Sequence, residues 1–148
     1  MNKYVKPDKS VIEEKLTDLQ YAVTQNASTE RPFYNEFWDT FNKGIYVDIV
    51  TGEPLFSSTD KFESSCGWPA FSKPIDEESV IKNQDLSFGM IRTEVKSRIG
   101  ESHLGHVFYG EPGTPEGVRY CINSASLRFI PYSEMESEGY GYLLDIFE

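Results

Sequence analysis

The sequence of 148 residues has only two cysteines and no long apolar run, and both absences narrow the class of protein. Two cysteines are too few for the disulfide framework of a small secreted module, and they do not form a CxxC pair. Residues 1–16 hold no apolar stretch of the ~7–15 residues that a signal peptide needs, and nowhere is there an apolar run of the ~18 residues of a membrane span. We therefore expect a cytoplasmic protein, where glutathione and thioredoxin keep thiols reduced.

Positive charge is also scarce. Fourteen Lys and Arg residues stand against 24 Asp and Glu residues, so the formal net charge is -10. Such a chain repels phosphate backbones and anionic lipid, which argues against nucleic acid and membrane partners. A hydrophobic content of 39% and an aromatic content of 14% exclude a disordered chain. The length fits one domain over residues 1–148, and we expect a monomer.

The pattern along the chain divides into three parts. Residues 1–42 carry helix signals, with Ser10 and Glu13 as a possible capping box, followed by an aromatic segment rich in turn formers. Residues 43–131 show short apolar runs separated by turn residues, which predicts an antiparallel β core. Residues 132–148 end in an apolar tail that we expect to dock on the domain. The predicted strands are residues 44–49, 54–57, 69–72, 89–98, 103–109, 118–123 and 126–130.

Cys121 lies in the predicted strand 118–123, where alternation places Arg119, Cys121 and Asn123 on one face. The apolar Val118, Tyr120 and Ile122 then face the core. A guanidinium two positions away favours a thiolate, so Cys121 is a candidate nucleophile. The alternative is a small cysteine that only packs.

Cys66 follows two serines and precedes Gly-Trp-Pro, so a turn holds Trp68 close to its thiol. The two thiols can meet only through the fold. Both histidines, His103 and His106, lie three positions apart, which puts them on opposite faces of an ideal strand. A β-bulge at Gly105 would bring them to the same side; otherwise one is a core histidine and the other a surface histidine.

Four motifs, taken in order, resemble those of the methionine sulfoxide reductase B family, the peptide-methionine (R)-S-oxide reductases. They are Leu19 to Gln25 (LQYAVTQ), Cys66 to Phe71 (CGWPAF), Ser102 to Phe108 (SHLGHVF) and Arg119 to Phe129 (RYCINSASLRF). The resemblance covers residues 15–148. It implies a mainly β fold of two antiparallel sheets forming a roll or barrel-like domain with short N-terminal helices.

The resemblance also implies a role for each site residue. Cys121 matches the catalytic cysteine and Cys66 the resolving cysteine. Trp68 matches the wall of the methyl pocket, with Phe108 as an aromatic beside the site. The remaining polar positions around the nucleophile are His103, His106, Arg119 and Asn123. Because imidazole has a pKa near working pH, we expect His103 to be the general acid, with His106 assisting.

Two positions depart from the family pattern. Many members bind a structural zinc ion through two CxxC pairs, but the matching positions here hold Asp48, Thr51, Ser97 and Gly100. The resemblance is therefore to a zinc-free subgroup without a cofactor. Around Glu111 the local order of residues also differs from the family pattern.

The implied reaction is reduction of methionine (R)-sulfoxide, mainly in proteins. The Cys121 thiolate attacks sulfur and becomes a sulfenic acid, and Cys66 then forms a disulfide that an external dithiol, thioredoxin, reduces. Two alternatives remain at this point: a peptide-binding module without chemistry, and a thiol peroxidase that forms the same sulfenic acid.

Overall fold

Two short α-helices precede the sheets in the computed structural model, which describes residues 4–64, 66–110, 114 and 116–148. Helix α1 spans Lys9–Lys15 and α2 spans Asp18–Asn26. The capping box expected at Ser10 is wrong, because α1 already begins at Lys9 and the side chain of Asp8, its N-cap, makes no capping bond. A capping box is found at α2 instead, where the Thr17 hydroxyl accepts from the Gln20 N–H and the Gln20 side chain accepts from the Thr17 N–H.

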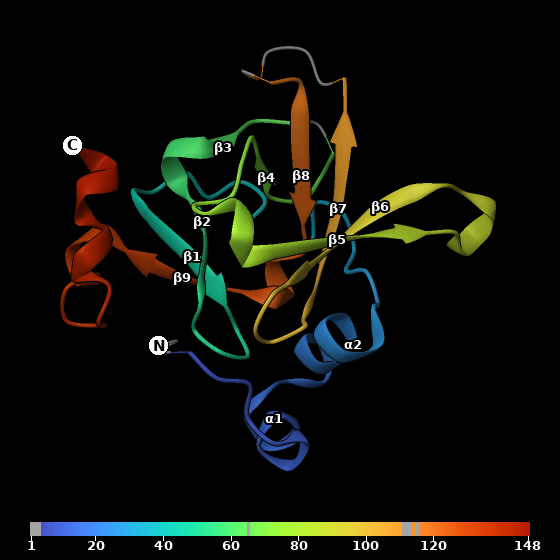
Figure 1. Cartoon of the computed structure of the whole chain (residues 1–148), viewed down its shortest axis with the longest axis horizontal. Helices are drawn as coiled ribbons and strands as arrows, with labels where there is room; N and C mark the ends of the chain where they lie inside the picture. Colours follow the sequence, from blue (N-terminus) through green and yellow to red (C-terminus); the bar gives the residue numbers. More distant parts are fainter. Residues whose placement is uncertain (1–3, 65, 111–113, 115) are drawn as a thin grey trace.

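The body of the protein consists of two antiparallel sheets (Figure 1). The three-stranded sheet has the order β2-β1-β9, with β1 at Gly44–Asp48, β2 at Pro54–Ser57 and β9 at Leu127–Pro131. The six-stranded sheet has the order β3-β4-β8-β7-β6-β5. Its strands are β3 (Lys61–Phe62), β4 (Ala70–Phe71), β5 (Val80–Asp85), β6 (Arg92–Ser97), β7 (His103–Tyr109) and β8 (Val118–Ile122). Both sheets are open, and the predicted mainly β fold of two antiparallel sheets with short N-terminal helices is confirmed.

Strands β3 and β5 were not expected from the sequence. β5 reads Val-Ile-Lys-Asn-Gln-Asp, is mostly exposed, and lies at the edge of its sheet. Its strand conformation comes from a continuous ladder with β6, from Val80 opposite Ser97 to Asp85 opposite Arg92. Pairing with a neighbour therefore overrides a local composition that is poor for a strand.

The main core lies between the sheets and is rich in aromatic rings. Phe56 stacks on Phe71 with centroids 4.5 Å apart, and the Tyr46 ring meets Phe71 edge-on at 5.2 Å. Tyr120 and Ile122 of β8 belong to this core, as their predicted orientation requires. The opposite face of β8, which carries Cys121, is thereby left for the functional site.

The C-terminal segment packs on the three-stranded sheet. Its two 3₁₀ turns, Tyr132–Glu134 and Gly141–Phe147, follow β9, and Met135 and Tyr140 lie in a cluster with strand residues Ile45 and Val47. Figure 1 shows this red segment beside β1 and β9, away from the β5–β6 hairpin. The predicted docking of the apolar tail is confirmed. No helix of the described residues is both long enough and apolar enough to cross a membrane.

Residues 27–43 connect α2 to β1 and are packed through their own rings. Phe33 meets Trp38 edge-on with centroids 5.1 Å apart, and Phe37 is buried in the main core. The Phe33 N–H donates to the carbonyl of Gly67, 2.8 Å away. This segment therefore lies against the loop that carries Cys66 and Trp68.

Candidate functional site

Cys121 lies on β8 between two strands, and these strands supply its neighbours. It is opposite His106 of β7 and opposite Ala70 of β4. Residues directly opposite in an antiparallel pair share one face of the sheet, so the His106 imidazole and the Cys121 thiol point the same way. Arg119 and Phe108 form the next such pair on that face, with the guanidinium carbon 4.9 Å from the ring centroid.

A bulge in β7 brings the two histidines together. Val95 is opposite Gly105, whereas the next residue, Lys96, is opposite His103, so β7 holds one extra residue at this point. The rings of His103 and His106 are consequently 5.7 Å apart. A side chain at Gly105 would collide with the carbonyl oxygen of Cys121, which explains why glycine occupies this position. Of the two alternatives that the sequence left open, the bulge beside Gly105 is the one found in the structure.

The two cysteine sulfurs lie 2.8 Å apart, joined by a hydrogen bond and not by a disulfide. Cys66 reaches Cys121 from the loop between β3 and β4, where Gly67 adopts a φ of 88° that side-chain-bearing residues rarely adopt. The pKa of Cys66 is lowered to about 6, first by the hydrogen bond from Cys121 and then by its backbone and Ser64 contacts and by the charge of Arg119. Near neutral pH this pKa favours a thiolate on Cys66, with Cys121 as its hydrogen-bond donor.

Arg119 acts on this pair from the side of Cys66. Its Nη1 donates to the Ser64 hydroxyl at 3.3 Å, and its charge favours the Cys66 thiolate. The sequence associated Arg119 with Cys121 alone, because both residues lie on one face of β8. The fold adds Cys66 to the same electropositive environment.

A small cavity of about 70 Å³ opens over the Cys121 side of the pair. Its described lining includes site residues expected from the sequence, namely Trp68, His106, Phe108, Cys121 and Asn123, and the bulge residue Gly105. Thr29 and Arg92 also line it. His103 is not among them; it lines two neighbouring grooves. The pocket is therefore walled by an indole and a phenyl ring, with an imidazole and an amide as polar groups.

The two histidines have different carboxylate partners. His106 Nε2 lies 2.7 Å from Asp85 Oδ2, and this contact is the main cause that holds the pKa of Asp85 well below its usual range. His103 Nδ1 lies 2.7 Å from Glu94 Oε2. Burial nevertheless lowers the pKa of His103, because desolvation outweighs the effect of Glu94.

Glu30 is a site residue that the sequence did not reveal. Its carbonyl accepts from Trp68 Nε1 at 2.9 Å, and its N–H donates to Asn123 Oδ1 at 3.0 Å. Its buried carboxylate accepts from the N–H groups of Ser124 and Ala125, immediately after Asn123. Burial raises the pKa of Glu30 to about 7, although these two N–H groups oppose the shift. Because Glu30 follows α2 without any local pattern of burial, only the tertiary structure identifies it.

Asn123 is fixed from two sides, so its amide orientation is defined. Oδ1 accepts from Glu30 and Nδ2 donates to the carbonyl of Leu104, 3.0 Å away in the β7 bulge. Trp68, Asn123 and the bulge thus belong to one hydrogen-bonded network that surrounds the Cys121 pocket.

The four positions that match zinc ligands in the family do come together in the fold. Asp48 is buried and accepts hydrogen bonds from the hydroxyls of Ser97, at 2.6 Å, and Ser102, at 3.0 Å. Gly100 and Thr51 are adjacent, since a Cβ on Gly100 would touch both Asp48 and Thr51. A carboxylate and hydroxyls do not form the thiolate set of a structural zinc site. Within the described part of the chain, no group of three or more His, Cys, Asp or Glu side chains could hold a metal ion.

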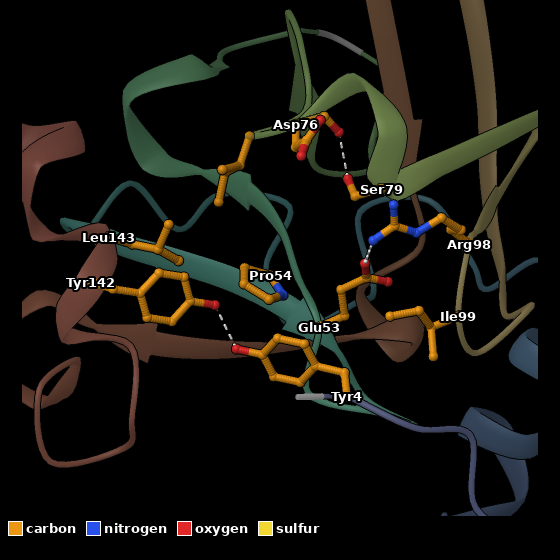
Figure 2. Close-up of a pocket in the computed structure, with 10 residues that line it drawn as sticks. Tyr4, Glu53, Pro54, Asp76, Ser79, Arg98, Ile99, Tyr142 and Leu143 are labelled. Atoms are coloured by element: carbon orange, nitrogen blue, oxygen red, sulfur yellow. Dashed lines mark hydrogen bonds and ion pairs between the residues drawn. The ribbon is translucent and has the colours of Figure 1, made fainter. Parts of the chain in front are cut away.

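A larger groove of about 540 Å³ lies elsewhere, between the N-terminal segment and the C-terminal 3₁₀ turn (Figure 2). In it the Tyr4 and Tyr142 hydroxyls are 2.6 Å apart, and Arg98 pairs with Glu53 at 3.2 Å. Its described lining contains neither cysteine nor histidine, so thiol chemistry belongs to the smaller pocket. Glu111, whose role the sequence left open, lies outside the described residues.

Comparison with protein families gives one match. The family model described as the SelR domain matches residues 16–131, which is most of the chain and includes every residue placed around the Cys121 pocket.

Proposed function

Because the chain belongs to the SelR domain family, the methionine-R-sulfoxide reductase B family, and is therefore an oxidoreductase of the peptide-methionine (R)-S-oxide reductase class, we propose a mechanism in which two cysteines act in sequence. The observation that carries the proposal is the 2.8 Å separation of the Cys121 and Cys66 sulfurs beside a pocket walled by Trp68. Cys121 is the nucleophile, since it is the cysteine that lines this pocket.

In the first step Cys121 transfers its proton to the Cys66 thiolate, to which it is hydrogen-bonded, and attacks the sulfoxide sulfur as a thiolate. The sulfoxide oxygen takes up a proton and passes to Cys121, which becomes a sulfenic acid, while methionine is released. Cys121 is thereby oxidised and the substrate sulfur is reduced by two electrons. The sulfoxide methyl group packs on Trp68, with Phe108 as the neighbouring aromatic wall.

The proton donor in this proposal is His106. It lines the pocket and lies on the Cys121 face of the sheet, with Asp85 bonded to its other side. His103 supports it through ring contact at 5.7 Å, so the order of importance expected from the sequence is reversed. Arg119 completes the site by stabilising the thiolate of the cysteine pair, and Asn123 by orienting the sulfoxide oxygen.

In the second step Cys66 attacks the Cys121 sulfenic acid, and a disulfide and one water molecule are formed. An external dithiol, for which we propose thioredoxin, then reduces the disulfide through a mixed disulfide. Cys66 is the accessible partner for this exchange, since it is partly exposed whereas Cys121 is buried. We further propose that the enzyme acts on oxidised proteins as a cytoplasmic, zinc-free monomer.

Mass spectrometry after one equivalent of methionine-R-sulfoxide tests the proposal. We expect one methionine per enzyme and a loss of two hydrogens that maps to Cys66 and Cys121. Release of methionine without this disulfide would contradict the resolving role of Cys66. A strong preference for the R over the S epimer is expected, because Trp68 and His106 fix the methyl group and the oxygen on opposite sides of the attacked sulfur.

A further inference from the structure

The turn of the β5–β6 hairpin is unusually apolar for an exposed turn. The side chains of Leu86, Phe88, Met90 and Ile91 are all exposed, with Phe88 at 88% and Ile91 at 79% of full exposure. Turns are ordinarily built from glycine, proline and small polar residues. In Figure 1 the end of this hairpin projects beyond the other strands of the six-stranded sheet, and the tip, residues 86–91, contributes no residue to the buried core.

Phe88 holds its outward position at a cost. Its φ of 56° lies in the left-handed region, which a bulky aromatic residue rarely adopts. Residues in such conformations cluster at ligand-binding and active sites. The ring is presented to solvent and not folded back onto the hairpin.

A groove of about 350 Å³ connects this tip with the catalytic pocket. Its lining includes Leu86 and Phe88 from the hairpin tip, Ala27 and Thr29 from the segment after α2, and both histidines, His103 and His106. Thr29, Arg92 and His106 also line the Cys121 pocket, so the groove and the pocket are continuous. A substrate polypeptide whose methionine sulfoxide side chain enters the pocket can therefore continue along this groove.

The charged groups of the groove already have partners within the protein. Asp85 is bonded to His106 and paired with Arg92 at 3.5 Å, and Glu94 is bonded to His103. The tip adds the exposed apolar side chains of Leu86 and Phe88 to this groove. The polar groups that the described structure leaves without a hydrogen-bond partner there are the buried nitrogens His103 Nε2 and Arg92 Nε. Methionine is among the residue types most often buried, so a segment that exposes it on unfolding commonly brings apolar neighbours with it.

We propose that the groove and the hairpin tip bind the polypeptide on one side of the methionine sulfoxide, with an apolar side chain of the substrate packed on Leu86 and Phe88. This inference rests on the proposed function and adds a substrate preference to it. The tip then adds binding only to substrates that carry an apolar residue beside the sulfoxide.

The test compares two substrates in the Leu86→Ser/Phe88→Ser variant and in the wild type. One substrate is N-acetyl-methionine-R-sulfoxide N-methylamide, and the other is a blocked pentapeptide with leucines on both sides of the same sulfoxide. We expect the ratio of kcat/KM values, peptide over small sulfoxide, to fall about tenfold in the variant, the effect of losing one well-buried apolar contact. The matched control is Val5→Ser/Val11→Ser, which removes two exposed aliphatic side chains away from the groove and leaves the ratio unchanged.

An unchanged ratio in the hairpin variant would overturn the proposal. It would also be overturned if the variant changed only the KM for thioredoxin, which would make the tip a reductant site, or only the oligomeric state in sedimentation, which would make it a contact between two copies. Failure of the proposed function is distinguishable, because the wild type would then reduce neither substrate. In that case, weaker binding of the fluorescently labelled pentapeptide after the hairpin substitutions in a Cys121→Ser background still supports docking, and equal binding refutes it.

Discussion

At the scale of single residues, Cys121 and Cys66 occupy different surroundings, so replacing each by serine should remove a different step of the reaction. Cys121→Ser should release no methionine, because a serine hydroxyl is a far poorer nucleophile than a thiolate. Cys66→Ser should release about one methionine per enzyme in a single turnover and then stall with thioredoxin, since only disulfide formation is lost. Rapid-quench measurement of methionine separates the two variants. Sustained thioredoxin-coupled turnover by Cys66→Ser would show that another route regenerates Cys121.

His106 and His103 differ in their relation to the pocket, and their substitution should reflect it. His106→Ala is expected to lower kcat by about 10²–10⁴, the usual contribution of a general acid, because its ring lines the Cys121 pocket. His103→Ala should cost less, since His103 acts through His106. Single-turnover rates with methionine-R-sulfoxide test this order. A larger loss in His103→Ala would identify His103 as the general acid, as expected from the sequence.

Glu30 connects Trp68 to Asn123 through its backbone and fixes the following turn through its carboxylate. Glu30→Gln replaces one acceptor oxygen by an NH2 group opposite the N–H groups of Ser124 and Ala125, so we expect about a tenfold lower kcat/KM. The stability has a definite pH dependence. The folded-state pKa, about 7, lies above the ordinary value of 4.5, so ionisation costs the folded state, and stability falls as the pH rises through this window.

Urea unfolding at pH 4.5 and pH 7.5 measures how the ionisation of Glu30 changes the free energy of unfolding. The free energy of unfolding of the wild type relative to Glu30→Gln should be lower at pH 7.5 than at pH 4.5. A difference that does not depend on pH would mean that Glu30 ionises in the folded protein as it does in the unfolded chain.

At the scale of secondary-structure elements, the β7 bulge brings the two histidine rings together beside Cys121 of the neighbouring strand β8. Gly105→Ala should destabilise the protein by about 2–4 kcal/mol and remove most activity, because the added methyl group meets the Cys121 carbonyl on the neighbouring strand. Gly141→Ala is the control, since a Cβ there finds only ordinary contacts. Urea unfolding of both variants provides the comparison. Equal stability of the two would show that β7 and β8 can separate locally without loss.

The same elements show how far local pattern predicts this structure. Alternation along residues 118–123 predicted correctly which face of β8 carries Cys121. The His-Leu-Gly-His spacing left two alternatives open, a bulge at Gly105 or histidines on opposite faces, and could not decide between them. The capping box was assigned to the wrong helix, because Ser10-Glu13 and Thr17-Gln20 both satisfy the same local rule. β5 and Glu30 could not be predicted, since a polar edge strand and a buried acid each depend on partners far along the chain, Arg92–Ser97 for β5 and Asn123–Ala125 for Glu30.

At the scale of the whole molecule, Asp48 joins the turn after β1 to the β6–β7 connection through its hydrogen bonds to Ser97 and Ser102. Asp48→Ala should lower the free energy of unfolding by about 3 kcal/mol, because Ser97, Ser102 and the Val50 N–H lose a buried acceptor. The control is Asp145→Ala at an exposed position, with a change of at most about 0.5 kcal/mol.

The replacement of zinc ligands by the Asp48 cluster also predicts the metal content of the protein. The purified protein should contain no stoichiometric zinc, and its Tm should not change with a chelator. One zinc ion per chain, or a Tm that falls with the chelator, would contradict the zinc-free proposal and require ligands outside this cluster.

The close approach of the two sulfurs has a further consequence for the proposed sulfenic acid of Cys121. A sulfenic acid exposed to peroxide proceeds to sulfinic acid, which ordinary thiols cannot reverse. Here a second thiol is within 2.8 Å from the moment the sulfenic acid forms, whereas peroxide must first diffuse in. Ring closure therefore competes with overoxidation at a very high effective concentration. Under oxidative load the protein would accumulate as a reducible disulfide and not as a dead enzyme, and its capacity would return as soon as dithiol is available.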